Sequence, residues 1–242
     1  MHSTGLVKNN YIYNLLYQLS NIIVPVVTMP YLTRTIGALG LGEYSFAYSV
    51  AYYFTVFIKL GLNNYGNRTI AYVKGNRESL SKTFWGIYTS QFVIGIVVAC
   101  IYILYAIFFA PNRTLGIIMA ILVFSSVIDV TWCMYGLEKF KVTATRDIIT
   151  KVLTMLFILT FVKTQNDVWK YALIFSLGML INQLVVLPIL KGEIVYCKVD
   201  RTDIIKHIRP NFMFFIPVIA VSVYRTMDKI MLGILSNDME LG

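Results

Sequence analysis

Charged side chains are scarce in this sequence. Asp, Glu, Lys and Arg make up 14% of its 242 residues, and 57% of the residues are hydrophobic. A soluble domain has about 25% charged residues, so the composition argues against a soluble protein. The net charge of +9 is divided among short segments between long apolar stretches, which is typical of a membrane protein. Because these cations do not gather on one soluble face, nucleic acid is not an expected partner.

Residues for catalysis and metal binding are also few. Cys100, Cys133 and Cys197 lie far apart without a CxxC spacing, which argues against a disulfide framework and a zinc site. His2 and His207 are the two histidines, and the second falls in a predicted basic cytoplasmic loop, so a His-based triad is not supported. The sequence also lacks a Walker loop and a GxSxG elbow. We expect no enzyme activity, no catalytic residue, no metal and no cofactor.

Long apolar runs dominate instead. An apolar helix needs about 20 residues to cross the bilayer. Seven windows of roughly this length are bounded by charges or turn residues: 11–33, 44–62, 84–110, 114–136, 148–162, 169–190 and 210–235. The sequence therefore predicts an all-α integral membrane protein, a polytopic bundle of about seven transmembrane helices.

The cations also predict the orientation of this bundle. If the seven windows alternate across the membrane, fourteen Lys and Arg residues lie on the side of the N-terminus and four on the other side, with Lys59, Arg225 and Lys229 inside spans. Cytoplasmic loops retain positive charge. We expect a multi-pass protein of the bacterial inner membrane with a cytoplasmic N-terminus.

The odd number of spans predicts two unequal parts. Residues 1–209 would form a six-helix transmembrane lobe, and residues 210–242 the first helix of a second lobe. Membrane transporters are often built from such repeats. We therefore expect the sequence to be part of a longer protein.

Polar side chains recur at helical spacing in the first two spans. Asn14, Gln18 and Asn21 share one stripe, and Tyr52, Thr55 and Lys59 share another. These stripes either form hydrogen bonds between helices or line a hydrophilic cavity, because lipid does not satisfy amide groups. For Lys59, extension of its ammonium to water at the membrane surface is the favoured interpretation over a lumen role.

Two further sites carry charge inside predicted spans. Asp129 is a candidate proton or sodium site, or alternatively a residue that joins helices or a loop through an Arg or the backbone. Arg225, Asp228 and Lys229 share one helix face, which is either a solvated helix end or a cationic patch suited to phosphate. Asp228 is a second ion-coupling candidate.

Four segments resemble the Wzx-type polysaccharide flippases, within the multidrug-exporter-like (MATE-like) superfamily. They are the Pro-Tyr-Leu-Thr-Arg segment at 30–34 with the glycine-rich run at 36–49, the G-x-x-x-Y-G-x-R-x-I-A pattern at 61–71, the I-D-x-x-W and G-L-E-x-F patterns at 128–140 followed by Arg146, and the D-K-x-x-L-G pattern at 228–233. They occur in family order over most of the chain.

The resemblance implies a function and a set of partners. It implies the N-terminal lobe of a MATE-like transporter plus its seventh helix, moving undecaprenyl-diphosphate-linked oligosaccharide repeat units across the inner membrane by alternating access. Membrane lipid, a coupling H⁺ or Na⁺ and polysaccharide assembly proteins would be further partners. The alternatives are a MATE-like cation or drug antiporter, a membrane-embedded transferase and a noncatalytic scaffold of an assembly complex.

The predicted topology can be tested by cysteine labelling in intact cells. An impermeant maleimide should label Asn112→Cys from outside and reach Asn76→Cys only after the membrane is opened. Labelling of both positions from the same side would contradict the predicted topology.

Overall fold

The structure, a computed structural model, describes residues 2–235, except for the side chains of 2–12, 14, 225, 226, 228–230 and 232–235. These residues form helices and no strand, as predicted. The elements are α1 (His2–Thr35), α2 (Gly37–Lys59), α3 (Leu62–Val73), α4 (Arg77–Phe108), α5 (Arg113–Val127), α6 (Thr131–Gly136), α7 (Phe140–Phe161), η1 (Gln165–Asp167), α8 (Val168–Leu184), α9 (Val186–Leu190) and α10 (Arg201–Leu235).

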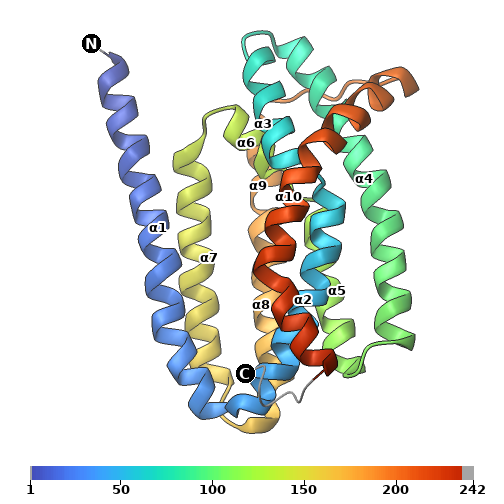
Figure 1. The fold of residues 1–242 in the computed structure, drawn as a ribbon. Helices are drawn as coiled ribbons and strands as arrows, with labels where there is room; N and C mark the ends of the chain where they lie inside the picture. The colour runs from blue at the N-terminus through green and yellow to red at the C-terminus, as the bar shows by residue number, and fades with distance from the viewer. Residues whose placement is uncertain (1, 236–242) are drawn as a thin grey trace.

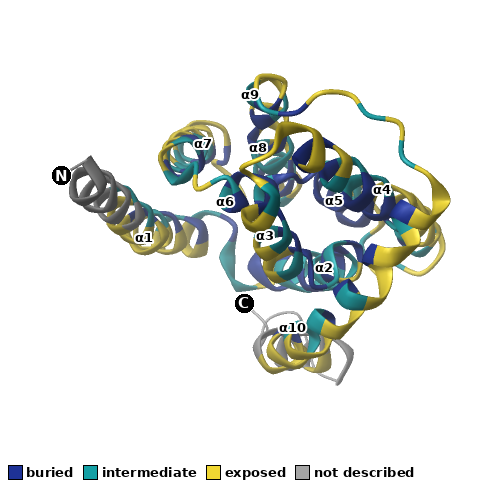
Figure 2. Cartoon of the chain, turned by 90° about the horizontal axis from the view of Figure 1, so that it is seen from above, coloured by how far each residue is buried: buried dark blue, intermediate teal, exposed yellow. Residues whose placement is uncertain are grey.

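The long helices run side by side in an up-and-down bundle (Figure 1). Seen from above, α2, α5 and α8 occupy the centre, while α1 lies at the edge beside α7 and α10 lies at another edge beside α2 (Figure 2). The short helices α3 and α6 pack together at the end where the N-terminus lies (Figure 1). α4 and α5 each begin after a short polar loop. The side-chain oxygens of Asn76 and Asn112 cap their first turns.

The outer surface of the bundle is apolar. On α4, for example, Val93, Val97 and Leu104 are each more than half exposed. Six helical segments are long and apolar enough to cross a membrane, so the chain is a multi-pass all-α membrane protein. α7 falls outside these six because it carries Lys141, Arg146, Asp147 and Lys151, and the count of seven spans stays a prediction.

Two helices begin earlier than the apolar windows indicate. α7 starts at Phe140 and not near residue 148, so it also includes Lys141 and Arg146. α10 starts at Arg201 and not at Pro210. His207 is therefore a buried helix residue and not a loop residue, and the hydroxyl of Tyr65 lies 2.6 Å from its Nδ1. The division into lobes at residue 209 stays a prediction, although the helix continues through that position.

Close contact between α3 and α6 depends on two glycines. A Cβ atom on Gly66 would lie 2.6 Å from the indole of Trp132, and one on Gly136 would lie 2.6 Å from Cβ of Ile70. Trp132 itself is 2% exposed and packs on Phe84 at a ring distance of 5.6 Å. The two motif segments at 61–71 and 128–140 thus form one packed unit.

Replacing Gly66 by Leu should lower the thermal stability of the detergent-solubilised protein. The new side chain must displace the buried indole of Trp132, and overpacking of this kind costs about 1–3 kcal/mol. Gly75→Leu is the matched control, because no atom lies within 4 Å of a Cβ built at Gly75. Equal melting temperatures for the two variants would show that α3 and α6 do not require this close contact.

Candidate functional site

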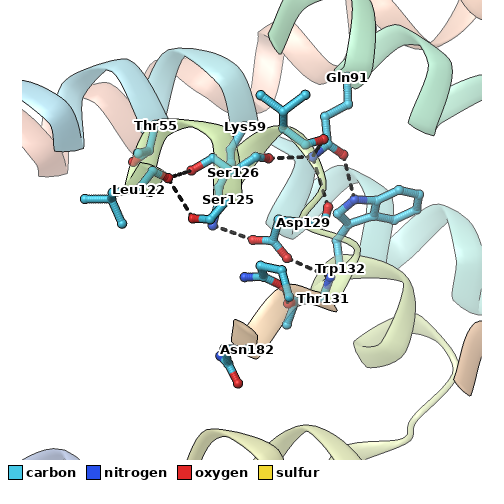
Figure 3. A network of polar contacts seen from close by, with 12 residues as sticks. Thr55, Lys59, Gln91, Leu122, Ser125, Ser126, Asp129, Thr131, Trp132 and Asn182 are labelled. Atoms are coloured by element: carbon cyan, nitrogen blue, oxygen red, sulfur yellow. Dashed lines mark hydrogen bonds and ion pairs between the residues drawn. The ribbon is translucent and has the colours of Figure 1, made fainter. Parts of the chain in front are cut away.

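The fourth apolar run is broken at Ile128–Val130, between α5 and α6. Gln91 of α4 fills the break: its amide nitrogen lies 3.0 Å from the carbonyl oxygen of Ser126, 3.4 Å from that of Val127 and 2.9 Å from that of Asp129. The Trp132 indole donates to the other end of the same amide at 3.0 Å (Figure 3). At the break these carbonyl oxygens lose the N–H donors that a continuous helix would provide. The buried amide of Gln91 replaces those donors.

Asp129 lies at this break and forms an ion pair with Lys59. Its Oδ2 lies 2.5 Å from the Lys59 ammonium, and its Oδ1 accepts from the backbone N–H of Thr131 at 2.9 Å (Figure 3). Lys59 therefore pairs with Asp129 while its side chain stays 30% exposed, and both its extension to water and its lumen role stay predictions. Asp129 joins α2 to the α5–α6 break, as one of its two interpretations expected, and its role in ion coupling stays a prediction.

The polar contacts continue to α7 and α8. Arg146 donates to the Thr131 hydroxyl at 3.3 Å and pairs with Asp147 at 2.9 Å. Asp147 in turn accepts from the amide of Asn182 at 2.8 Å, and Thr150 donates to Asn182 at 3.2 Å. This set of side chains, which we call the break network, joins α2, α4, α6, α7 and α8.

The break network separates two apolar clusters. Ile58 and Val127 belong to one cluster, and Val130 and Trp132 belong to the other. The network carries two cations and two carboxylates, so its formal charge is zero. Its buried positions identify it as a structural joint, since buried charges persist in proteins when they are paired and hydrogen-bonded. Nη1 of Arg146 is buried without a partner among the described residues.

A second polar set lies on the exposed side of α1. Gln18 and Asn21 are exposed, and the Lys151 ammonium of α7 donates to the Asn21 side chain. The same ammonium lies 4.3 Å from the ring centroid of Tyr17. Lys151 was counted among the cytoplasmic cations and missed as a site residue, because its partner Asn21 lies 130 positions away in the sequence. We call Tyr17, Gln18, Asn21 and Lys151 the α1 stripe.

The polar residues predicted to share a stripe on α2 differ in burial and in their contacts. Tyr52 is half-buried and stacks on Tyr48 at 6.1 Å. Thr55 is buried, and its hydroxyl donates to the carbonyl of Tyr52 at 2.8 Å, so its donor is used within the helix. The structure does not bring Thr55 together with the α1 stripe. A substrate contact by Tyr52, Thr55 or Lys59 stays a prediction.

Four predicted site residues lie where the structure describes the helix but not the side chain. Asn14 belongs to α1, and Arg225, Asp228 and Lys229 belong to α10. Their contacts are outside the described part of the chain, so their assignment to a cavity or ion site stays a prediction.

Comparison with known proteins gives a consistent picture. The family of polysaccharide biosynthesis proteins matches residues 7–242. Two curated relatives, each provisionally named an O-antigen transporter, are 26% identical over 97% of the chain (Escherichia coli K12) and 23% identical over 96% of it (Shigella dysenteriae). The chain spans 58% and 59% of their lengths. No solved structure matches it.

The pair of Lys59 and Asp129 should respond unequally to removal of its two members. Lys59→Ala leaves the carboxylate of Asp129, a side chain that is 5% exposed, without its cation, whereas Asp129→Asn leaves the ammonium of Lys59, a side chain that is 30% exposed. Breaking a buried pair costs about 3–5 kcal/mol. We expect Lys59→Ala to lower the melting temperature in detergent more than Asp129→Asn, and the double variant to recover part of the loss.

Lys74→Ala is the control for this comparison. Lys74 pairs with Glu138 at 2.6 Å, but both side chains are more than a third exposed, and exposed pairs contribute about 0–1 kcal/mol. Equal losses from Lys59→Ala and Lys74→Ala would show that the pair with Asp129 is not a structural joint.

Proposed function

The chain belongs to the polysaccharide biosynthesis protein family, and from this premise we propose that it forms part of a carrier for lipid-linked oligosaccharides. The carrier would move undecaprenyl-diphosphate-linked repeat units across the bacterial inner membrane. The names of the two relatives support transport of an O-antigen, and the lipid-linked form of this cargo is part of the proposal. The described helices would supply one lobe of this carrier. We place its N-terminus in the cytoplasm, on the side favoured by the distribution of cations.

The α1 stripe is the observation that carries this proposal. Gln18 and Asn21 are exposed in a segment that is apolar enough to cross a membrane, and the half-buried Lys151 of α7 donates to Asn21. Amide groups facing lipid would be costly, so we infer that this side of α1 faces water or another part of the carrier. An ammonium with amides beside it suits a diphosphate-linked sugar, because it offers a cation to phosphate and donors to hydroxyls.

The charges favour this cargo over the cationic drug of the antiporter alternative. The two buried carboxylates of the break network, Asp129 and Asp147, are already paired with Lys59 and Arg146. The α1 stripe contains a cation and no carboxylate. A cationic drug would require a free acid there, whereas a diphosphate would not.

Alternating access and ion coupling are finer parts of the same proposal. With a cytoplasmic N-terminus, the break network lies toward the cytoplasmic end of the bundle, because α3 and α6 lie at the N-terminal end (Figure 1). A proton or sodium ion at Asp129 would compete with Lys59 and loosen α2 from the break. This would couple ion binding to movement of the helices.

The proposal is tested in the full-length parent protein, expressed in cells that lack their own flippase. Lys151→Gln and Arg225→Ala should each abolish surface polysaccharide without changing the amount of membrane protein, because each removes a cation offered to the diphosphate. Lys141→Gln and Arg209→Ala are the controls, since both side chains are exposed cations nearer the ends of the same helices.

Two outcomes would contradict the proposal. If the wild-type protein fails to restore polysaccharide, the carrier function is wrong. If Lys151→Gln and Arg225→Ala restore it as well as their controls do, these cations do not act on the cargo.

A further inference from the structure

A cavity of about 590 Å³ opens at the end of the bundle where α2, α5 and α8 begin. It lies at the end opposite the break network, because α2 runs from this cavity to Lys59 at its other end. The first turns of the three helices form its walls, and cavities of about 300–1,000 Å³ are the usual size for small-ligand sites. The break network and the α1 stripe share no residue with it.

Some polar side chains of this cavity form hydrogen bonds within the protein, and others do not. Asn112 donates to Glu43 at 2.7 Å and also caps α5, so both ends of its amide are used. The side chains of Thr114, Gln165 and Asn166 have no hydrogen-bond partner among the described residues, although all three line the cavity. A hydroxyl and two amides can both donate and accept, as sugar hydroxyls do.

Trp169 adds an aromatic surface to the same wall. It is 45% exposed and lies at the start of α8, next to Val168 and the free amides of η1, and the ammonium of Lys170 lies 5.8 Å from its ring centroid. The indole lines a polar cavity, and a pyranose ring offers an apolar C–H face that packs on such a surface. A wall that combines amides, a hydroxyl and an indole therefore matches both faces of a sugar.

The charge of the cavity indicates which part of a lipid-linked sugar, the diphosphate or the saccharide, it would bind. Glu43 is the one charged residue among those that line the cavity, and it is an acid. The nearby Asp167 is paired with Lys170 at 2.6 Å. A diphosphate or an acidic sugar would be repelled by Glu43, whereas the hydroxyls of a neutral saccharide can donate hydrogen bonds to it.

We propose that this cavity is a saccharide-binding site for neutral sugar units of the cargo, on the side of the membrane opposite the N-terminus. The inference rests on the proposed function, which supplies a sugar-bearing cargo and the outward position of this end. Sugar units leaving the carrier would bind between Trp169 and the amides of Gln165 and Asn166, while the diphosphate stays with cations elsewhere.

The first experiment measures surface polysaccharide in flippase-deficient cells that express the full-length parent at a limiting level. Trp169→Ala should reduce the polymer about fivefold, as expected when one aromatic packing contact is lost from a binding site. Trp169→Phe should retain most of it. Phe108→Ala is the control, because Phe108 is an exposed aromatic residue at the last turn of α4 that does not line the cavity.

The second experiment uses the full-length parent with all its native cysteines, among them Cys100, Cys133 and Cys197, replaced by Ser. Asn166→Cys and Arg113→Cys are labelled from outside with an impermeant maleimide, in cells that make the lipid-linked sugar and in cells that lack the first glycosyltransferase. We expect the sugar to slow labelling of Asn166→Cys several-fold and to leave Arg113→Cys unchanged.

The outcomes separate this inference from the proposed function. Failure of the wild-type protein to restore polymer would overturn the carrier function itself. Restoration by the wild type, with Trp169→Ala equal to Phe108→Ala, would overturn the saccharide site alone. Equal labelling of Asn166→Cys in both kinds of cell, or no labelling from outside, would also overturn it.

Discussion

Backbone oxygens inside a membrane must find donors within the protein, and this constraint organises the described bundle. The α5–α6 run breaks at Ile128–Val130, which would leave carbonyls unsatisfied in lipid. The amide of Gln91 supplies these donors from α4, and its own oxygen holds the indole of Trp132. Because Trp132 is then fixed, Gly66 can bring α3 into contact with it. A break in one helix therefore determines how its neighbour packs.

The same constraint explains what the sequence reveals well. Long apolar runs must be helices if they enter a bilayer, so most of the predicted windows match helices of the structure. Boundaries were predicted less well at α7 and α10, where Arg146 and Arg201 were taken as loop residues. Both residues belong to helices, since Arg146 is paired with Asp147 inside the bundle and Arg201 begins α10 at an exposed end.

Partners of single polar residues were harder to predict because they come from distant segments. Lys59 and Asp129 are 70 positions apart, and Gln91 reaches the break from a third helix. Spacing along one helix says which face a side chain occupies but not which helix lies opposite. The break also ends the helical spacing at Asp129, so a face of α5 does not continue into α6. Only the fold could pair these groups.

The two ends of the bundle differ in how their polar groups are used. In the break network nearly every group is paired, so its cations and carboxylates hold helices together and leave little to bind a cargo. At the other end, Gln165 and Asn166 keep their hydrogen-bonding capacity. The α1 stripe lies between these extremes, with one half-buried ammonium that donates to the exposed Asn21. A cargo with a charged diphosphate and neutral sugars needs both a cation and neutral hydrogen-bonding groups. The described helices provide the cation in the α1 stripe and the neutral groups in the cavity at the other end.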